Sequence, residues 1–350
     1  MRVVVVGATG NVGTSLVAAL ADEPAVDSVL GLARRRPALA VPKTEWAEAD
    51  ISRDDLRPLF RGAGAVVHLA WLLQPTRDRE RLWRVNVDGS TRLFTAVREA
   101  RVPALVYASS IGAYSRAPKD GAVDERWPTE GIPQNAYSRE KAELERRLDR
   151  FEREAPGVRV VRLRPALTFK YESASEQRRL FAGPFLPRSL LRRELVPALP
   201  DIPGLRVQAV HTADVADAYR RALVSDASGP FNVAAEPVLS PAELAAALGA
   251  RLVRVPARAV RGASALAWRL RLIPVPASWL DLALAVPVMD TARARELLGW
   301  RPERTALAAL EEVVRGVRDG AGLDTPPLSP ATSGRFRSRE LAAGVGGRDL

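Results

Sequence analysis

A tyrosine and a lysine four positions apart, Tyr137 and Lys141, are the residues of this sequence best suited to acid–base chemistry. They stand at the start of a segment with helical periodicity, 136–154, so both side chains would share one helix face. A phenol has a pKa of about 10, and a neighbouring ammonium group favours the phenolate, which predicts a lowered pKa for Tyr137. The spacing alone is common by chance, and a pair on a helix surface is the simpler interpretation.

Two serines, Ser109 and Ser110, follow a strand-like run, Ala104–Tyr107. A hydroxyl group at a strand end can hydrogen-bond a substrate carbonyl or alcohol, although ending the strand is the simpler role. The chain has no cysteine and only two histidines, His68 and His211, which excludes disulfides and thiolate chemistry and leaves a histidine metal site dependent on carboxylates. We therefore expect no metal site, and tyrosine, lysine and serine are left to carry a reaction.

A glycine-rich segment follows the first strand-like run, Val3–Val6, and precedes a helical pattern over 11–21. Its glycines have the spacing GxxGxxG rather than the GxGxxG of many dinucleotide sites. Glycine lets the backbone turn tightly and approach a ligand, and the following helix N-terminus presents N–H donors to a pyrophosphate. This context favours nucleotide binding over an ordinary turn, and the candidate cofactor residues are Gly7, Thr9, Gly10, Asn11, Val12 and Gly13.

The second strand-like run, Ser28–Leu32, leads into three consecutive arginines. Sites for NAD present a carboxylate near this point, about 20 residues after the glycines, to bind the ribose hydroxyls. No carboxylate stands here, and Arg34 and Arg35 instead suit a 2′-phosphate. The sequence therefore favours NADP as the cofactor, with NAD as the alternative. Ordinary surface charge in an arginine-rich chain is the competing interpretation of these arginines.

Strand-like and helix-like segments alternate through the first half of the chain, the pattern of a parallel sheet with helices on both faces. Helical patterns include 54–60, 81–100, 136–154 and 175–193. The predicted fold class is α/β, a Rossmann-like doubly wound parallel sheet that binds ligands at the carboxyl ends of its strands. We expect a dinucleotide-binding domain over 1–166, a smaller, partly interleaved C-terminal substrate lobe over 167–322, and a disordered tail over 323–350.

The formal net charge is +11, from 52 basic and 41 acidic residues. Such a balance can indicate nucleic acid or an anionic membrane surface, but the basic residues are spread along the chain without a long block. Solvated surface charge is the preferred interpretation, and we expect neither a nucleic-acid nor a membrane partner. The apolar start, 3–21, is interrupted by the glycines, so neither a signal peptide nor a membrane span is predicted, and the expected location is cytoplasmic.

Further motifs follow one another along the chain, namely Ala49-Asp50-Ile51, Val67-His68-Leu69-Ala70, Val85-Asn86-Val87-Asp88-Gly89, Arg164-Pro165, His211-Thr212-Ala213-Asp214-Val215-Ala216, Phe231-Asn232-Val233 and Leu298-Gly299-Trp300-Arg301-Pro302. Together with the glycine loop, the two serines and the Tyr137–Lys141 pair, they resemble the extended short-chain dehydrogenase/reductase superfamily, the NAD-dependent epimerase/dehydratase family. The resemblance covers roughly residues 1–318 and is specific for the superfamily rather than for a substrate.

The resemblance implies a role for each matching residue. Tyr137 becomes the general acid/base, Lys141 holds the nicotinamide ribose and lowers the pKa of the tyrosine, and Ser110 aligns with the catalytic serine. Ser109 is the alternative register. The other implied cofactor contacts are Asp50, Ile51, Leu69, Ala70, Asn86 and Pro165, and a structural role is the alternative for the asparagine. Both histidines are expected to be structural.

The sequence also departs from the sugar-nucleotide members of this family. They often carry an asparagine just after the Arg-Pro motif and an arginine four residues before the later histidine, where this chain has Ala166 and Val207. These departures favour an NADP(H)-dependent oxidoreductase that acts on a carbonyl or alcohol of a less polar small molecule. The alternatives are a sugar-nucleotide epimerase or dehydratase with retained NAD(P), and a non-catalytic regulator that senses the cofactor.

Two further expectations concern the pocket and the assembly. Residues that could line an apolar substrate pocket are Trp71, Leu72, Trp268, Trp279 and Leu282, although the protein core is the simpler place for each. The helical segments 81–100 and 136–154 resemble the dimer face of the family, which makes a homodimer a further hypothesis.

Overall fold

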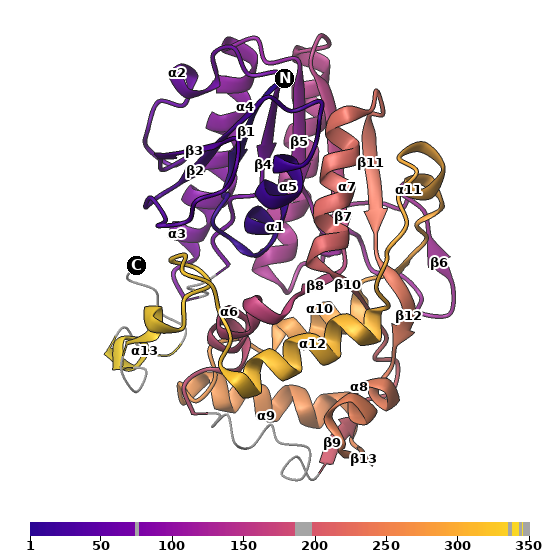
Figure 1. Ribbon diagram of the computed structural model, residues 1–350. Coiled ribbons are helices and arrows are strands. Elements are labelled where there is room, and N and C mark those ends of the chain that lie inside the picture. Colours follow the sequence, from indigo (N-terminus) through magenta and orange to yellow (C-terminus); the bar gives the residue numbers. More distant parts are fainter. Residues whose placement is uncertain (74–76, 186–197, 335–337, 343–344, 346–350) are drawn as a thin grey trace.

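The computed structural model describes the chain except residues 74–76, 186–197, 335–337, 343–344 and 346–350. Its larger lobe is a seven-stranded parallel sheet (Figure 1) with the strand order β11-β7-β5-β4-β1-β2-β3. The strands are β1 (Arg2–Val6), β2 (Ser28–Ala33), β3 (Thr44–Glu48), β4 (Ala65–His68), β5 (Ala104–Ala108), β7 (Arg159–Pro165) and β11 (Gly229–Val233). Because the order steps outward in both directions from β1, the predicted doubly wound, Rossmann-like sheet is confirmed.

The central strand β1 explains how the sheet is held between two helical layers. Its side chains alternate, with Val3 and Val5 in one apolar cluster and Val4 and Val6 in another, so the strand is buried on both faces. The first cluster lies under α1 (Asn11–Ala21) and α7 (Thr212–Val224), and the second lies under α2 (Arg57–Phe60), α4 (Gly89–Glu99) and α5 (Ala136–Glu154). The glycine loop directly follows this buried strand, so it lies at the carboxyl edge of the sheet.

Most predicted elements of this lobe are present, with two differences. The helices over 11–21 and 136–154 are confirmed, but the pattern over 81–100 contains α3 (Arg79–Trp83), a π-helical turn (Arg84–Asp88) and α4. The edge strand β3 was not predicted, because Thr44-Glu45-Trp46-Ala47-Glu48 is half-exposed and lacks an apolar run. Its pairing with β2 extends the sheet and positions the residues that follow each of these strands.

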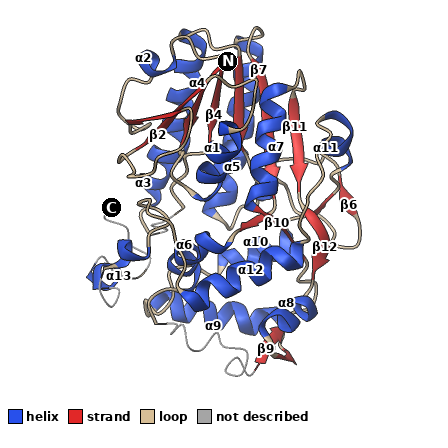
Figure 2. Cartoon of the chain, in the orientation of Figure 1, coloured by secondary structure: helices blue, strands red, loops and turns tan. Residues whose placement is uncertain are grey.

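The smaller lobe lies at the carboxyl ends of the large sheet's strands (Figure 1) and is mostly helical (Figure 2). Its small sheets are formed by β6 (Ala122–Val123), β8 (Leu167–Phe169), β9 (Ala198–Asp201), β10 (Val207–His211), β12 (Ala235–Leu239), β13 (Arg251–Arg254) and β14 (Val288–Met289). Its helices are α6 (Ala174–Gln177), α8 (Pro241–Leu248), α9 (Ala257–Arg269), α10 (Ser278–Ala285), α11 (Ala292–Leu297) and α12 (Ala306–Asp319). The helix predicted over 175–193 falls partly outside the described residues.

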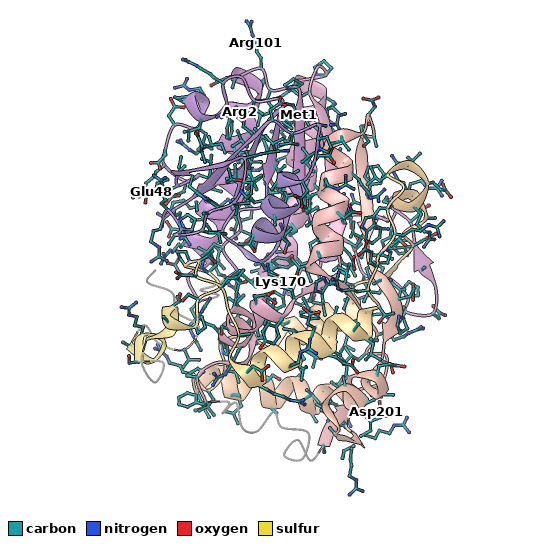
Figure 3. All side chains as sticks on the ribbon, viewed as in Figure 1. Met1, Arg2, Glu48, Arg101, Lys170 and Asp201 are labelled. Atoms are coloured by element: carbon teal, nitrogen blue, oxygen red, sulfur yellow. The ribbon has the colours of Figure 1, made fainter. Side chains whose placement is uncertain are left out.

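The two lobes are interleaved in sequence. Segments beyond residue 166, α7 and β11, belong to the larger sheet and its helical layer, so a cut at residue 166 does not separate the lobes. Lys170, labelled in Figure 3, follows β8 and donates hydrogen bonds to Thr14 at 2.7 Å and Ser15 at 3.0 Å on α1. A buried lysine thus links the smaller lobe to the helix that follows the glycine loop.

The C-terminal segment differs from expectation. A disordered tail was predicted from residue 323, and this prediction is wrong for residues 323–334, which pack against the body of the protein. Leu328 is fully buried, and the Thr325 hydroxyl donates a hydrogen bond to the Thr9 carbonyl at 2.9 Å. A short 3-10 helix, Pro330–Ser333, follows. The contacts of Thr325 and Leu328 hold this segment against the rest of the protein, although its proline-rich composition is typical of a disordered tail.

Within the described part of the chain, no helix combines the length and apolarity needed to cross a lipid bilayer.

Candidate active site

The glycine loop has the backbone geometry expected of a pyrophosphate cradle. Gly7 has a φ of +88°, and a Cβ atom on it would lie 2.6 Å from the Ala70 nitrogen. A Cβ atom on Gly13 would lie 2.3 Å from the Gly7 carbonyl oxygen. Gly10 caps α1 without a side chain, so the N–H groups of the first helical turn stay available to an anion. Both clashes are with the protein's own backbone, so these glycines permit the tight turn and the close packing of α1 and the end of β4. This turn leads into a helix N-terminus with free N–H groups, which fits the pyrophosphate of a dinucleotide.

Other predicted cofactor residues gather around this loop. Leu69 and Ala70 follow β4, and the Leu69 N–H donates to the Val6 carbonyl at 2.8 Å, which places the two segments side by side. The Asn11 side chain instead donates to the Thr168 carbonyl at 3.1 Å and accepts from Thr212, so it joins the two lobes. Thr9 and Val12 are directed into protein contacts, and Pro165 ends β7 beside β11.

The ends of β2 and β3 form a second part of the candidate cofactor groove. Arg34 and Arg35 are exposed directly after β2, and the Asp50 carboxylate, just beyond β3, lies close enough to Arg34 to interact with it electrostatically. Asp50 accepts hydrogen bonds from the Ser52 backbone and hydroxyl at 2.9 and 2.6 Å. Ile51 packs against the start of α4.

A cavity of about 290 Å³ lies beside these strand ends, and the C-terminal segment forms its other wall. Arg35 and Arg36 line one side, and Thr325, Thr332 and Arg339 line the other. The segment that was predicted to be disordered therefore contributes a third guanidinium group, Arg339, and one carboxylate, Asp324, to this cavity.

The serine, tyrosine and lysine singled out from the sequence come together at the carboxyl end of β5. Asn135 caps α5 by accepting a hydrogen bond from the Ser138 backbone at 3.0 Å, which fixes Tyr137 in the first helical turn. The Tyr137 ring lies against Gly112, where a Cβ atom would approach the ring to 2.7 Å and the Ser110 hydroxyl oxygen to 3.3 Å, so the serine and the tyrosine are neighbours. Lys141 follows one turn later and donates to the Ala108 carbonyl at 2.7 Å.

The two serines have different partners. Ser110 accepts a hydrogen bond from the Gly112 N–H at 2.9 Å and contacts Tyr137, whereas Ser109 points away and donates to Glu145. Glu145 is almost fully buried and also binds Arg164 at 2.9 Å and Arg162 at 3.0 Å. Ser109 therefore belongs to a buried charge network that joins α5 to β5 and β7, and Ser110 is the serine placed beside the tyrosine.

Burial dominates the electrostatics of this cluster. Burial raises the pKa of Tyr137 to about 12, and the neighbouring Ser110 hydroxyl only partly opposes the rise. The expectation that Lys141 lowers this pKa is wrong for this structure, because the lysine is itself buried. Burial lowers the pKa of Lys141 to about 7, although Glu140 and Glu145 oppose that change. At neutral pH the tyrosine thus keeps its proton, and the lysine is no longer a permanent cation.

Asn86 has a structural role in addition to any contact with a cofactor. Its amide donates to Glu140 at 2.8 Å and to the Leu72 carbonyl at 2.9 Å, and it accepts from the Leu72 N–H at 2.8 Å. Burial raises the pKa of Glu140 to about 7, with the Asn86 hydrogen bond opposing the rise. His68 is buried and hydrogen-bonded to Ser90, as expected of a structural histidine.

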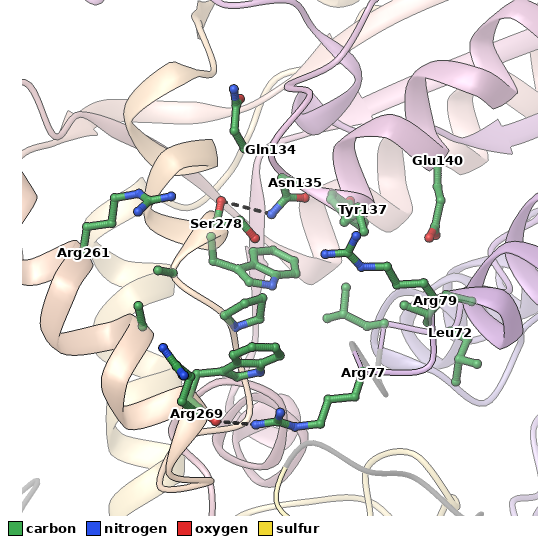
Figure 4. A pocket seen from close by; sticks show the side chains of 18 of the residues that line it. Leu72, Arg77, Arg79, Gln134, Asn135, Tyr137, Glu140, Arg261, Arg269 and Ser278 are labelled. Atoms are coloured by element: carbon green, nitrogen blue, oxygen red, sulfur yellow. Dashed lines mark hydrogen bonds between the residues drawn. The ribbon is translucent and has the colours of Figure 1, made fainter.

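A pocket of about 460 Å³ opens beside Tyr137 (Figure 4). Trp71 meets the tyrosine ring edge-on at 5.6 Å between centroids, and Trp279 stacks on it at 5.4 Å. Of the lining residues proposed from the sequence, Trp71, Leu72, Trp268 and Trp279 line the pocket, whereas Leu282 lies in a small apolar cluster of the core. The other polar lining residues were not predicted from the sequence, namely Arg77, Arg79, Gln134, Asn135, Glu140, Arg261, Arg269 and Ser278. In a chain this rich in arginine, no local signal distinguishes those four guanidinium groups.

Comparisons with known proteins agree with this fold. Residues 3–234 match the model of the NAD dependent epimerase/dehydratase family. An uncharacterized protein of Mycobacterium tuberculosis is 28% identical over 92% of this chain and 31% of its own length, so the chain spans about a third of that relative. Sterol demethylase protein B of Methylococcus capsulatus is 33% identical over 41% of this chain and 44% of its own length. The structure of Thermus thermophilus UDP-glucose 4-epimerase in complex with NAD is similar with a TM-score of 0.65 and 22% identity, and the match covers 91% of this chain and 99% of that one.

Proposed function

The chain belongs to the NAD-dependent epimerase/dehydratase family, and on that premise we propose that it is an NADP(H)-dependent oxidoreductase. Its substrate is a small molecule with a carbonyl or alcohol group, which reacts at Ser110, Tyr137 and Lys141. The observation that carries the proposal is the placement of Ser110 beside Tyr137 at the pocket, with Lys141 one helical turn away.

The residues around the glycine loop fit a nicotinamide dinucleotide, since they offer a backbone cradle and a helix N-terminus. Gly7, Gly10 and Gly13 would hold the pyrophosphate. Asp50 and Ile51 would border the adenosine. The backbone of Leu69 and Ala70 would contact the cofactor. When bound, the cofactor supplies or accepts two electrons at its nicotinamide ring.

The remaining chemistry is a proton transfer performed by the chain itself. Tyr137 keeps its proton at neutral pH because burial raises its pKa to about 12, and it donates that proton to the oxygen of a carbonyl group during reduction. Ser110 holds the same oxygen through its hydroxyl group. Lys141 lies one helical turn after Tyr137 and would hold the nicotinamide ribose. A phenol that keeps its proton is ready to act as the acid, which is the role that carbonyl reduction requires.

A preference for NADP over NAD is part of the proposal. It is supported by the absence of a carboxylate at the end of β2 and by the exposed Arg34 and Arg35 at that position. The cavity lined by Arg35, Arg36 and Arg339 adds to the positive charge there. Guanidinium groups bind phosphate with paired hydrogen bonds, which suits a 2′-phosphate and not a free hydroxyl.

A sugar-nucleotide epimerase or dehydratase with retained cofactor is the second candidate, and the similar fold of the Thermus epimerase favours it. The two candidates differ in stoichiometry, because an epimerase consumes no added cofactor. The similarity to sterol demethylase protein B, together with the tryptophans around Tyr137, favours an apolar substrate instead.

The reaction is tested by following reduced-nicotinamide absorbance with NADPH and a panel of ketones and aldehydes. We expect stoichiometric oxidation of NADPH, and Tyr137→Phe should lower kcat about 100-fold or more because the proton donor is lost. The variant should still bind NADPH with unchanged affinity. Turnover that survives in Tyr137→Phe would refute the acid–base role. NADPH binding without any turnover in the unmodified protein would favour a regulator that only senses the cofactor.

The cofactor preference is tested by calorimetric titration with NADP and NAD. Arg35→Gln should weaken NADP binding about tenfold, the loss expected of one charge-assisted hydrogen bond, and leave NAD binding unchanged. Arg153→Gln, an exposed arginine near the end of α5, serves as the control. Tighter binding of NAD than of NADP by the unmodified protein contradicts the preference.

A further inference from the structure

The pocket beside Tyr137 has a composition that indicates which substrates it accepts. It lies between the segment before α3, the start of α5, and the helices α9 and α10 of the smaller lobe (Figure 4). Its volume of about 460 Å³ suits a ligand the size of a drug-like molecule rather than a single small group.

One side of the pocket is aromatic. Trp71, Trp268 and Trp279 line it, and Trp71 and Trp279 hold the Tyr137 ring between them. Flat aromatic walls favour a planar or apolar ligand body, because they offer large contact area without hydrogen-bonding groups to satisfy. This half of the pocket therefore offers apolar contact area to the body of a ligand.

The other side is cationic. The lining contains four arginines but only one acidic residue, Glu140, which is buried and hydrogen-bonded to Asn86. The charged lining residues are Arg77, Arg79, Glu140, Arg261 and Arg269.

Two of the four arginines already have partners. Arg261 pairs with Asp281 at 2.9 Å, and Arg77 lies over the Trp268 ring at 4.0 Å and donates to the Trp268 carbonyl. Arg79 and Arg269 are exposed, and neither has a hydrogen bond or ion pair with a residue that the structure describes. Two guanidinium groups from elements almost 200 residues apart in sequence thus line one pocket and face solvent without a protein counter-ion among the described residues.

We propose that the substrate carries an oxyanion, a carboxylate or a phosphate, on an apolar or planar body, with Arg79 and Arg269 binding the oxyanion and the tryptophans binding the body. The forked donors of arginine match the two oxygens of such a group. This inference rests on the proposed function, since it assigns a substrate class to the same site. It requires no further catalytic step, and Tyr137 remains the proton donor.

Binding of matched aryl ketones tests the inference directly. The probes are para-acetylbenzoate, its neutral methyl ester and para-acetylphenyl phosphate, each titrated into the protein loaded with NADP. Quenching of tryptophan fluorescence provides the readout, because three tryptophans line the pocket. We expect the carboxylate to bind about tenfold more tightly than the ester at low salt, and the difference to shrink as salt screens the charge. Tighter binding of the phosphate than of the carboxylate would identify phosphate as the preferred oxyanion.

Arginine variants distinguish binding of the acid in this pocket from binding by general surface charge. Arg79→Gln and Arg269→Gln should each reduce the preference for the acid severalfold, and the double variant should bind acid and ester equally. Arg258→Gln is the matched control, because Arg258 is exposed on the same helix α9 but does not line the pocket. All variants should bind the ester like the unmodified protein, which shows that they are folded.

The inference is overturned if the ester binds as tightly as the acid, or if the double variant keeps the preference. These outcomes are distinguishable from failure of the proposed function, which is measured separately by NADP titration and by oxidation of NADPH. A protein that binds NADP and reduces neutral ketones without a preference for acids would retain the function and lose the inference.

Discussion

Replacing Glu145 by glutamine is expected to lower the free energy of unfolding by about 3 kcal/mol, because it removes the only carboxylate shared by two buried arginines. Glu145 binds Arg164 through both carboxylate oxygens, at 2.9 and 3.0 Å, and Arg162 at 3.0 Å. Arg162 keeps Asp149 and Glu152 as partners. Arg164 would keep only the Tyr114 hydroxyl and a backbone carbonyl as hydrogen-bond partners, so its buried charge would lose its directly bound carboxylate and keep only a weaker electrostatic interaction with Glu125.

The pKa of Glu145 gives a second, independent value for the free energy that this carboxylate contributes to folding. It falls from 4.5 to about 2, because the two arginines and the Ser109 hydroxyl outweigh the cost of burial. A difference of this size favours the folded, ionised form by about 3 kcal/mol. The folded pKa lies below the unfolded value, so this stabilisation is complete above pH 4.5 and is lost as the pH falls towards 2.

The assay is urea unfolding followed by far-UV circular dichroism, at neutral pH and at about pH 3. The unmodified protein and Glu145→Gln should differ by about 3 kcal/mol at neutral pH and by less at the acidic pH. Glu143→Gln is the control, because Glu143 lies on the same helix but pairs with Arg146 and Arg147 near the surface, where an ion pair contributes about 1 kcal/mol or less. A difference below about 1 kcal/mol for Glu145→Gln, or one independent of pH, would refute the reasoning.

Three other changes test different parts of the structure. Gly13→Ala should lower Tm and weaken cofactor binding, because its Cβ atom would lie 2.3 Å from the Gly7 carbonyl oxygen. Gly157→Ala is the control and should change neither property, because a Cβ atom on Gly157 would have no neighbouring atom within 4 Å. Removing residues 323–350 should lower Tm, because the apolar surface that Leu328 now covers would be exposed to water. An unchanged Tm in a thermal melt would show that the segment adds no stability. Lys141→Met should abolish turnover yet raise the free energy of unfolding at neutral pH. Burial lowers the folded pKa of Lys141 from 10.5 to about 7, so the lysine costs stability below pH 10.5 and the gain should vanish towards that pH; a less stable variant in urea contradicts this.

The large sheet and its loop could be predicted from sequence because their signals are local. The run Val3–Val6 is apolar at every position, which is what burial on both faces requires, and the glycines follow it directly. The pair Tyr137 and Lys141 was equally accessible, since a spacing of four residues fixes a shared helix face before any tertiary contact forms. The half-exposed strand β3 and the π-helical turn within 84–88 lack such local signals, and both were missed.

The sequence by itself determined the fold class, the family, the glycine loop and the identity of the tyrosine–lysine pair, because each depends on residues close together in the chain. Only the tertiary structure decided which serine meets Tyr137, since β5 ends with Ser109 turned to Glu145 and Ser110 turned to the phenol. It also decided the raised pKa of Tyr137 and the placement of Arg79 and Arg269 at one pocket. The burial of a side chain and the electrostatic field around it depend on neighbours from distant segments of the chain. A local sequence pattern cannot reveal those neighbours.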